Sequence, residues 1–196
     1  MVKASLVIVT IVLITCVIYI LTNETYKLLY SVKIKSRVDN KYYTVRNVSP
    51  EYSINAADTL ATLNKNVGIL LDYLKANDDS FSTRLLIDRY NPDKLSENIL
   101  QIDTTFTIDK GPIEFCLDSR DPTQNTNEIH DINTLTYVII HELAHLASVT
   151  YNHTPEFKRN FAFLVKKSIE CGIYKYQDYS KQSVDYCGIS IKHSII

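Results

Sequence analysis

Apolar residues are unevenly distributed along the chain, and their densest run lies near its amino end. Residues 4–21 read ASLVIVTIVLITCVIYIL, which is 18 consecutive residues without a charge. A helix of this length reaches across the roughly 30 Å hydrocarbon core of a bilayer. A run that is apolar on every side is typical of a membrane-spanning helix rather than of a surface helix. We therefore expect residues 1–21 to form one transmembrane helix, in contact with lipid through residues 4–21.

A cleaved signal peptide is the alternative interpretation of this run. The run is longer than the usual apolar region of a signal peptide, and no small-x-small cleavage site follows it, which favours a lasting anchor. Lys27, Lys33, Lys35 and Arg37 follow the run, whereas only Lys3 and the amino terminus precede it. The positive-inside rule then predicts a single-pass membrane protein with its carboxyl-terminal bulk in the cytoplasm.

Helical periodicity first appears well after this segment. Residues 22–45 are polar and basic, and we expect a juxtamembrane linker there, with one strand around residues 42–45. Residues 46–196 are long enough for one domain with a single core. Apolar residues at spacings of three and four predict a helix over residues 55–76. A second, short helix is expected around residues 92–100.

The second half of the domain mixes strand and helix patterns. Two β-branched or alternating runs, 104–108 and 113–117, flank Gly111-Pro112 and predict a hairpin. Residues 119–131 are turn-rich and predict a loop. A nearly all-apolar helix follows, from Asn133 or Thr134 to Val149, and we expect it at the centre of the core. The last helix has Thr154 as its N-cap and ends at Gly172. The predicted fold class is α+β.

Charge and cysteine content narrow the function. The 196 residues carry 21 Lys and Arg against 22 Asp and Glu, so the broad basic surface of a nucleic-acid-binding protein is absent and no nucleic-acid partner is expected. Outside the apolar run the cysteines are Cys116, Cys171 and Cys187, with no C-x-x-C pair. We expect reduced, buried thiols, with a bridge between Cys171 and Cys187 only if the domain is exported.

The predicted buried helix carries the motif His-Glu-x-x-His, as His141-Glu142-Leu143-Ala144-His145. Residues four apart on a helix differ by about 40° around its axis, so both imidazoles project from one face and can reach one zinc ion. Glu142 projects about 100° away and is placed to act as general base on a metal-bound water. Two histidines and a glutamate in an apolar helix need partners, which a metal supplies. The alternative is two core histidines bonded to backbone carbonyls.

A catalytic zinc needs a third protein ligand and an open position. His153 is the predicted third ligand, because a short chain reversal between the two helices returns it to the metal. Glu156 and Glu170 are the rival ligands. His130 is expected to be exposed, with orientation of the substrate as the alternative, and His193 is expected to lie outside the site.

The segment H-E-L-A-H, then N-H-T-P-E-F, then a Phe-rich helix, resembles the minimal zinc metallopeptidases of the SprT, WLM and YgjP type. His153 and Phe157 match the downstream histidine and x-x-x-F pattern of those families. The chain is also similar to uncharacterised membrane-anchored proteins of large DNA viruses, in which a Tyr-Cys-Gly element such as Tyr186-Cys187-Gly188 recurs. The resemblance implies a zincin-like fold, with a small antiparallel sheet beside the motif helix, and peptide hydrolysis. It also admits a virion membrane as the location.

The expected function is therefore zinc-dependent endopeptidase activity by a membrane-anchored domain on a protein or peptide substrate. His141, His145 and His153 hold Zn²⁺, and Glu142 moves the proton. Tyr151, Tyr174 and Tyr176 are the candidates for stabilising the oxyanion. The hairpin over residues 104–117 is the candidate edge for a bound peptide. The rival functions are a membrane-tethered zinc-binding scaffold without hydrolysis and a zinc hydrolase acting on non-peptide substrates.

Overall fold

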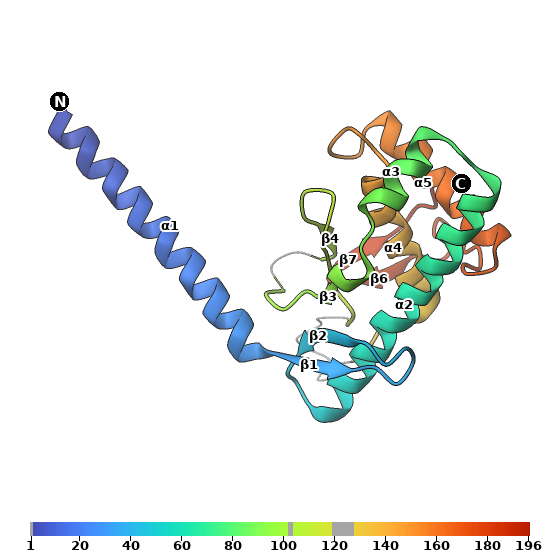
Figure 1. The fold of residues 1–196 in the computed structure, drawn as a ribbon, viewed down its shortest axis with the longest axis horizontal. Coiled ribbons are helices and arrows are strands. Elements are labelled where there is room, and N and C mark those ends of the chain that lie inside the picture. The colour runs from blue at the N-terminus through green and yellow to red at the C-terminus, as the bar shows by residue number, and fades with distance from the viewer. Residues whose placement is uncertain (1, 102–103, 119–127) are drawn as a thin grey trace.

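The computed structural model describes residues 2–101, 104–118 and 128–196. Its first element, α1 (Val2–Tyr30), projects away from a domain that contains every other element (Figure 1). The apolar side chains between Val7 and Leu21 are more than half exposed. By length and composition α1 is able to cross a membrane, a criterion that a signal sequence also meets. Lipid is the environment that suits this apolar surface.

The strand expected around residues 42–45 is confirmed as β2 (Tyr42–Arg46), whereas the rest of the expected linker is also ordered, which moves the start of the domain toward the amino end. Helix α1 continues to Tyr30, and β1 (Ser31–Lys35) and β2 form an antiparallel hairpin. The hairpin packs against α2, with Tyr43 and Val45 buried. Side chains of β2 alternate between the core and the surface, so only every second residue is buried. The polar and basic residues of the segment hid this alternation in the sequence.

Helix α2 spans Pro50–Asn77 and begins earlier than predicted, because Ser49 caps it by accepting a hydrogen bond from the Tyr52 amide. A further helix, α3 (Phe81–Arg89), was not predicted; its only buried side chains are Thr83 and Leu86, too few to give a periodic pattern. The predicted helix at residues 92–100 is wrong. That segment is a 3₁₀ turn at Pro92–Lys94 followed by β3 (Leu95–Glu97).

A three-stranded sheet has the order β3-β5-β4. The predicted hairpin is confirmed, since β4 (Phe106–Thr107) pairs antiparallel with β5 (Ile113–Phe115). The expectation of a purely antiparallel sheet is wrong, because β3 pairs parallel with β5. The strand β4 is therefore an edge strand of this small sheet.

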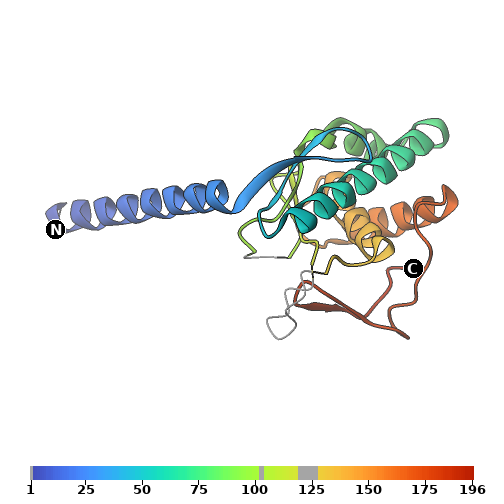
Figure 2. The same ribbon diagram turned by 90° about the horizontal axis from the view of Figure 1, so that it is seen from below.

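Helix α4 (Ile132–Leu146) is the central helix of the core, as predicted, and most of its side chains are buried. Its N-cap is Asp131, and it ends three residues before the predicted end. Helix α5 (Pro155–Glu170) lies against α4, and Thr154 caps it as predicted. Gly172 follows with a φ of 80°, the left-handed conformation expected after a helix. In Figure 2, α2, α4 and α5 stack as the helical body of the domain. The predicted loop at residues 119–131 falls mostly on 119–127, outside the described residues.

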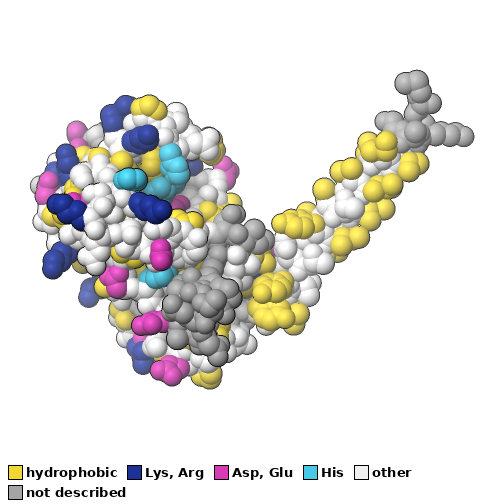
Figure 3. Space-filling view, turned by 180° about the vertical axis from the view of Figure 1, so that it is seen from behind, with side chains coloured by type: hydrophobic (Ala, Val, Ile, Leu, Met, Phe, Trp, Pro, Cys, Tyr) yellow, Lys and Arg dark blue, Asp and Glu magenta, His cyan; other side chains and the backbone are white. Residues whose placement is uncertain are grey.

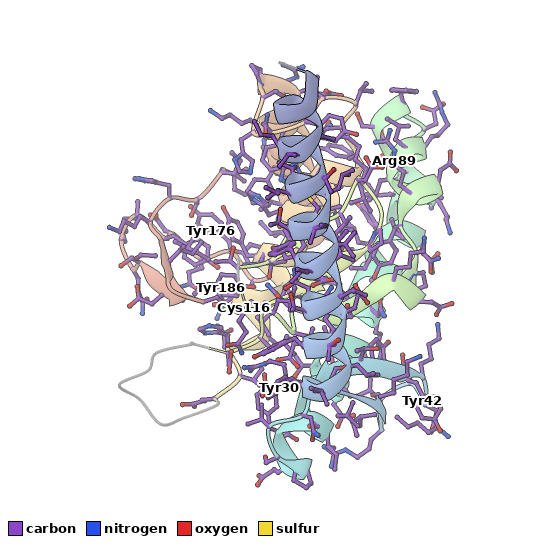
Figure 4. All side chains as sticks on the ribbon, turned by 90° about the vertical axis from the view of Figure 1, so that its left-hand side faces the viewer. Tyr30, Tyr42, Arg89, Cys116, Tyr176 and Tyr186 are labelled. Atoms are coloured by element: carbon purple, nitrogen blue, oxygen red, sulfur yellow. A yellow bond between two sulfur atoms is a disulfide. The ribbon has the colours of Figure 1, made fainter. Side chains whose placement is uncertain are left out.

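The carboxyl-terminal segment forms a hairpin of β6 (Val184–Tyr186) and β7 (Ile189–Ile191). A disulfide joins Cys116, just after β5, to Cys187 in the hairpin turn, while Cys171 is free. The prediction of reduced thiols is therefore wrong for Cys116 and Cys187 and holds for Cys171, and the bridge that was expected only on export joins Cys187 to Cys116 instead of Cys171. The Tyr186 hydroxyl donates to the Cys116 carbonyl oxygen at 2.8 Å, which seats the turn against the sheet (Figure 4).

Candidate metal centre

Three histidines from two adjoining segments converge on one point. His141 and His145 lie one turn apart on α4, and His153 lies in the loop between α4 and α5. One ring nitrogen from each lies within 4.8 Å of the other two, and the Nε2 atoms of His141 and His153 are 3.0 Å apart. The structure thus brings together the three residues predicted as metal ligands.

The loop between the helices folds back because its backbone groups are bound locally. The Glu156 carboxylate accepts hydrogen bonds from the amides of Val149 and Thr150 at 2.8 and 2.9 Å, and from the Thr150 hydroxyl. Asn152 has a φ of 63°, which turns the chain sharply before His153. Glu156, the rival ligand, therefore shapes the loop and is not part of the histidine group.

Two cations bind the carboxyl end of α4 and the loop that follows it. The Lys110 ammonium, from the β4–β5 turn, donates to the carbonyl oxygens of His145, Ser148 and Thr150 at 3.2, 2.6 and 2.7 Å. Arg89 donates to the carbonyl oxygens of Leu146 and Ser148. Positive charge is favourable at a helix carboxyl terminus, where carbonyl groups lack partners within the helix. These contacts fix the main chain between His145 and His153.

Aromatic side chains of α5 pack beneath the histidine rings. The ring centroid of Phe157 lies 4.3 Å from that of His145 and 4.9 Å from that of His141, and Phe161 lies 5.1 Å from His141. Burial, together with the neighbouring histidines, lowers the pKa of His141 to about 3 and that of His145 to about 4. Both rings are therefore neutral at pH 7, which is the form that binds metal ions.

Glu142 lies on the same helix and faces the sheet. Its carboxylate accepts a hydrogen bond from the Thr107 hydroxyl of β4 at 2.7 Å. Burial raises the pKa of this carboxyl group to about 7, with the Thr107 hydrogen bond acting in the opposite direction. Glu142, Thr107 and the three histidines line one cleft of about 530 Å³. Figure 3 shows histidine side chains gathered on one face of the domain beside Lys or Arg side chains.

Most of the other residues that the sequence suggested for the site make contacts elsewhere in the domain. Glu170 binds Tyr73 and Lys167. His130 was expected to be exposed but is half-buried, and its Nε2 accepts the Cys187 amide. Tyr174 is buried and the Tyr176 hydroxyl reaches Ile196, so of the three candidate tyrosines only Tyr151 lines the cleft.

Two residues of the site were missed by the sequence analysis. Thr107 contacts Glu142, and Lys110 holds the loop that carries His153. The sequence offered a weak signal for both, since they lie in the predicted hairpin that was expected to border the substrate. Neither has a motif of its own, because their partners lie more than 30 residues away.

Comparison with known proteins places the chain among viral proteins. It is 38% identical over 171 residues to "Uncharacterized protein R325" of Acanthamoeba polyphaga mimivirus, and the match covers 83% of each chain. It is 27% identical over 165 residues to "Uncharacterized protein 136R" of Invertebrate iridescent virus 6, a match that covers 82% of this chain and 89% of that protein. No family model and no solved structure matches it. The chain therefore belongs to a family of large-DNA-virus proteins that includes R325 of mimivirus.

Proposed function

We propose that the domain is a zinc-dependent endopeptidase of zincin-like architecture, similar to the SprT and WLM type. The observation that carries the proposal is the convergence of His141, His145 and His153 beside the Glu142 carboxylate, in a cleft bordered by the edge strand β4. A peptidase of this kind needs that combination, namely metal ligands, a proton carrier and a surface for an extended chain.

The donor set fits zinc. Tetrahedral coordination at about 2.0–2.1 Å places ligand nitrogens about 3.3 Å apart, and the three histidine nitrogens already lie within 4.8 Å of one another. Three imidazoles are the protein ligands of a known class of catalytic zinc site. Among the residues that the structure describes, no fourth His, Cys, Asp or Glu joins this group, so a tetrahedral zinc held by the three histidines would keep one position for water or substrate.

Glu142 is the proton carrier in this proposal. When bound, the cation polarises the scissile carbonyl and makes an attacking water more acidic. Glu142 accepts the proton of that water and then delivers it to the leaving amine. The Thr107 hydroxyl holds the Glu142 carboxylate toward the cleft, so the carboxylate is oriented before substrate arrives.

The substrate would bind along β4. Among the described strands β4 pairs only with β5, so its other edge is available to an added strand. Phe106 and Thr107 line the cleft itself, which places an added peptide beside the histidines. Main-chain pairing of this kind suits a protein or peptide substrate.

Zinc content of the full-length protein tests the metal centre. We expect about one zinc per chain in the wild type, and binding weakened at least about tenfold in His153→Ala. His193→Ala is the matched control, because His193 is exposed and lies outside the histidine group. A folded wild type without zinc, or a His153→Ala variant with unchanged affinity, would contradict the site.

Digestion of unfolded casein and of a peptide library tests the reaction. Glu142→Gln should retain zinc and lose cleavage by a factor of about 100 or more. Glu170→Gln, at the far end of α5, should cleave like the wild type. Zinc binding without any cleavage would favour the rival function, a membrane-tethered zinc scaffold.

A further inference from the structure

A second hollow opens from the same histidines toward the carboxyl-terminal hairpin. It has a volume of about 660 Å³ and shares His141, Glu142 and His153 with the cleft. From there it runs between helices α4 and α5 on one side and β7 on the other. The hollow therefore extends the site from the histidines toward the β6–β7 hairpin.

The lining of this hollow is mainly apolar and aromatic. Tyr137, Val138 and Phe161 form the helical side, and each is less than 9% exposed. The rings of Tyr137 and Phe161 pack at 5.2 Å, and the Phe161 ring continues to His141 at 5.1 Å. Ile189 and Ile191 face them from the hairpin. An apolar surface therefore begins directly at the proposed metal ligand.

Few of the side chains that line the hollow carry a charge. Among the described residues that line it, Glu142 lies at the end shared with the cleft, and Lys192 and His193 are exposed residues of the carboxyl-terminal segment. The lining also includes Thr104, Thr105 and Ser190, which are polar but uncharged. A charged group packed against Tyr137, Val138 and Phe161 would lose its hydration, and these side chains offer it no ionic partner.

The hairpin side of the hollow is held in place. The disulfide between Cys116 and Cys187 fastens the β6–β7 turn to the end of β5. The buried Tyr186 hydroxyl adds a hydrogen bond to the Cys116 carbonyl (Figure 4). A hollow whose two sides are fixed binds an apolar group without a cost for ordering them.

We propose that this hollow is a specificity site that receives a large apolar or aromatic side chain from the substrate residue next to the scissile bond. The location of this residue beside the scissile bond rests on the proposed peptidase function, whereas its apolar character follows from the lining of the hollow. Burial of one such side chain changes affinity by roughly ten- to hundredfold. The expected substrates are peptides with Phe, Tyr, Leu or Ile at that position.

A binding experiment tests the hollow without requiring hydrolysis. The full-length protein in lipid nanodiscs is labelled at isoleucine methyls and titrated with N-acetyl-phenylalanine amide, with N-acetyl-glycine amide and N-acetyl-glutamate amide as matched probes. We expect saturable shifts of the Ile189 and Ile191 methyls with the phenylalanine probe only. Equal responses to all three probes, or none, would overturn the proposal.

Variants at the hairpin make the test specific. Ile189 is 51% exposed, so Ile189→Asp should fold, and it should weaken the phenylalanine probe about tenfold or more. Ile132→Asp is the control, since Ile132 is 41% exposed and lies outside the hollow. If Ile189→Asp binds the probe as the wild type does, the hollow is not its site.

A peptide library separates failure of this inference from failure of the proposed function. Cleavage enriched in large apolar residues at one flanking position, shifted toward Lys and Arg by Ile189→Asp, would support both. Cleavage with no such preference would overturn the specificity site and leave the peptidase standing. With no cleavage at all the peptidase fails, and the amide titration alone decides what the hollow binds.

Discussion

The position of His153 depends on a few residues that hold the loop before it. Asp109 and Lys110 both have positive φ values, 44° and 55°, which is uncommon for residues with side chains. This turn points the Lys110 ammonium at three carbonyl groups of the α4 terminus and its loop. The strained turn is maintained by those contacts. Lys110 is thus a positioning residue for the proposed metal centre.

Replacement of Lys110 by methionine should weaken zinc binding about tenfold, because the loop that carries His153 loses its shared cation. A competition titration with a chromophoric chelator measures the affinity, and Lys110→Arg should restore part of it. Lys158→Met is the control, since Lys158 is exposed on α5. If Lys110→Met binds zinc like the wild type, the loop holds its conformation by other contacts.

Glu156 predicts a dependence of stability on pH. Hydrogen bonds from the Thr150 hydroxyl and from the amides of Val149 and Thr150 lower the pKa of this carboxyl group from 4.5 to about 2. A lowered folded-state pKa stabilises the fold above the unfolded pKa, and this contribution is lost as the pH falls from about 4.5 to about 2. The melting temperature of the wild type should exceed that of Glu156→Gln by a few degrees at pH 6, and the difference should vanish near pH 2. A difference that is independent of pH would refute the assignment; Glu51→Gln, in the first turn of α2, is the control.

At the scale of elements, the helices form the body and two hairpins attach to it from opposite ends of the domain sequence. The β1–β2 hairpin is joined to the sheet by Arg46, whose guanidinium pairs with the buried carboxylates of Glu97 and Asp118. The β6–β7 hairpin is joined by the disulfide. The Arg46 ion pairs and the disulfide each connect segments that are distant in the sequence, so each closes a long loop.

Loss of the disulfide should destabilise the domain by about 4 kcal/mol, the chain-entropy value for a sequence separation of 71 residues. Urea unfolding of a Cys116→Ser, Cys187→Ser double variant measures this against Cys171→Ser, which removes only a free thiol. Because the proposed zinc ligands come from α4 and its loop, zinc affinity should change little in the double variant. An unchanged unfolding midpoint would show that the bridge does not constrain the unfolded chain.

At the scale of the whole molecule, the apolar helix and the domain are directly connected. Lys27 of α1 pairs with Glu114 of β5 at 2.7 Å, and the Asn47 amide donates to the Tyr30 carbonyl oxygen at 2.9 Å. The domain therefore begins within α1 and not after a flexible tether (Figure 1). A shortened chain for solution work has to retain residues 22–35, since the Lys27 and Tyr30 contacts and β1 would otherwise be lost.

Removal of residues 2–21 should convert the protein from a membrane-bound to a soluble form. We expect the full-length chain to stay in the pellet after alkaline carbonate extraction of membranes, and the shortened chain to appear in the supernatant. A full-length chain released by carbonate would identify the apolar run as something other than an anchor, such as a cleaved signal peptide. The mass of the purified protein distinguishes a lasting anchor from a signal peptide, because only the anchor leaves the full-length mass.

For a membrane-spanning α1, two physical rules predict opposite sides of the membrane for the domain. Basic residues after α1 favour the cytoplasm, whereas a lasting disulfide requires an oxidising compartment or a virion surface. Protease treatment of intact microsomes decides between them. Digestion of the domain agrees with the charge rule, and protection agrees with the bridge.

The sequence by itself determined the features that depend on local periodicity and capping. Helices α2, α4 and α5, the β4–β5 hairpin and the apolar α1 follow from spacings within a few residues of one another. The convergence of His141 and His145 is of this kind, because four residues are about one helical turn. His153 was predicted from the short chain reversal before Thr154, and it lies beside them.

Only the tertiary structure decided the pairings between distant segments. The parallel β3–β5 pair, the packing of the β1–β2 hairpin against α2, the Cys116–Cys187 bridge and the Lys110 contacts each depend on which surfaces remain after the helices pack. Several segments of the chain have a sequence pattern that would allow such a pairing. The entropy cost of loop closure differs little between them, because it grows slowly with loop length. Burial and hydrogen bonding in the assembled core then select one partner from among them, which no local spacing specifies.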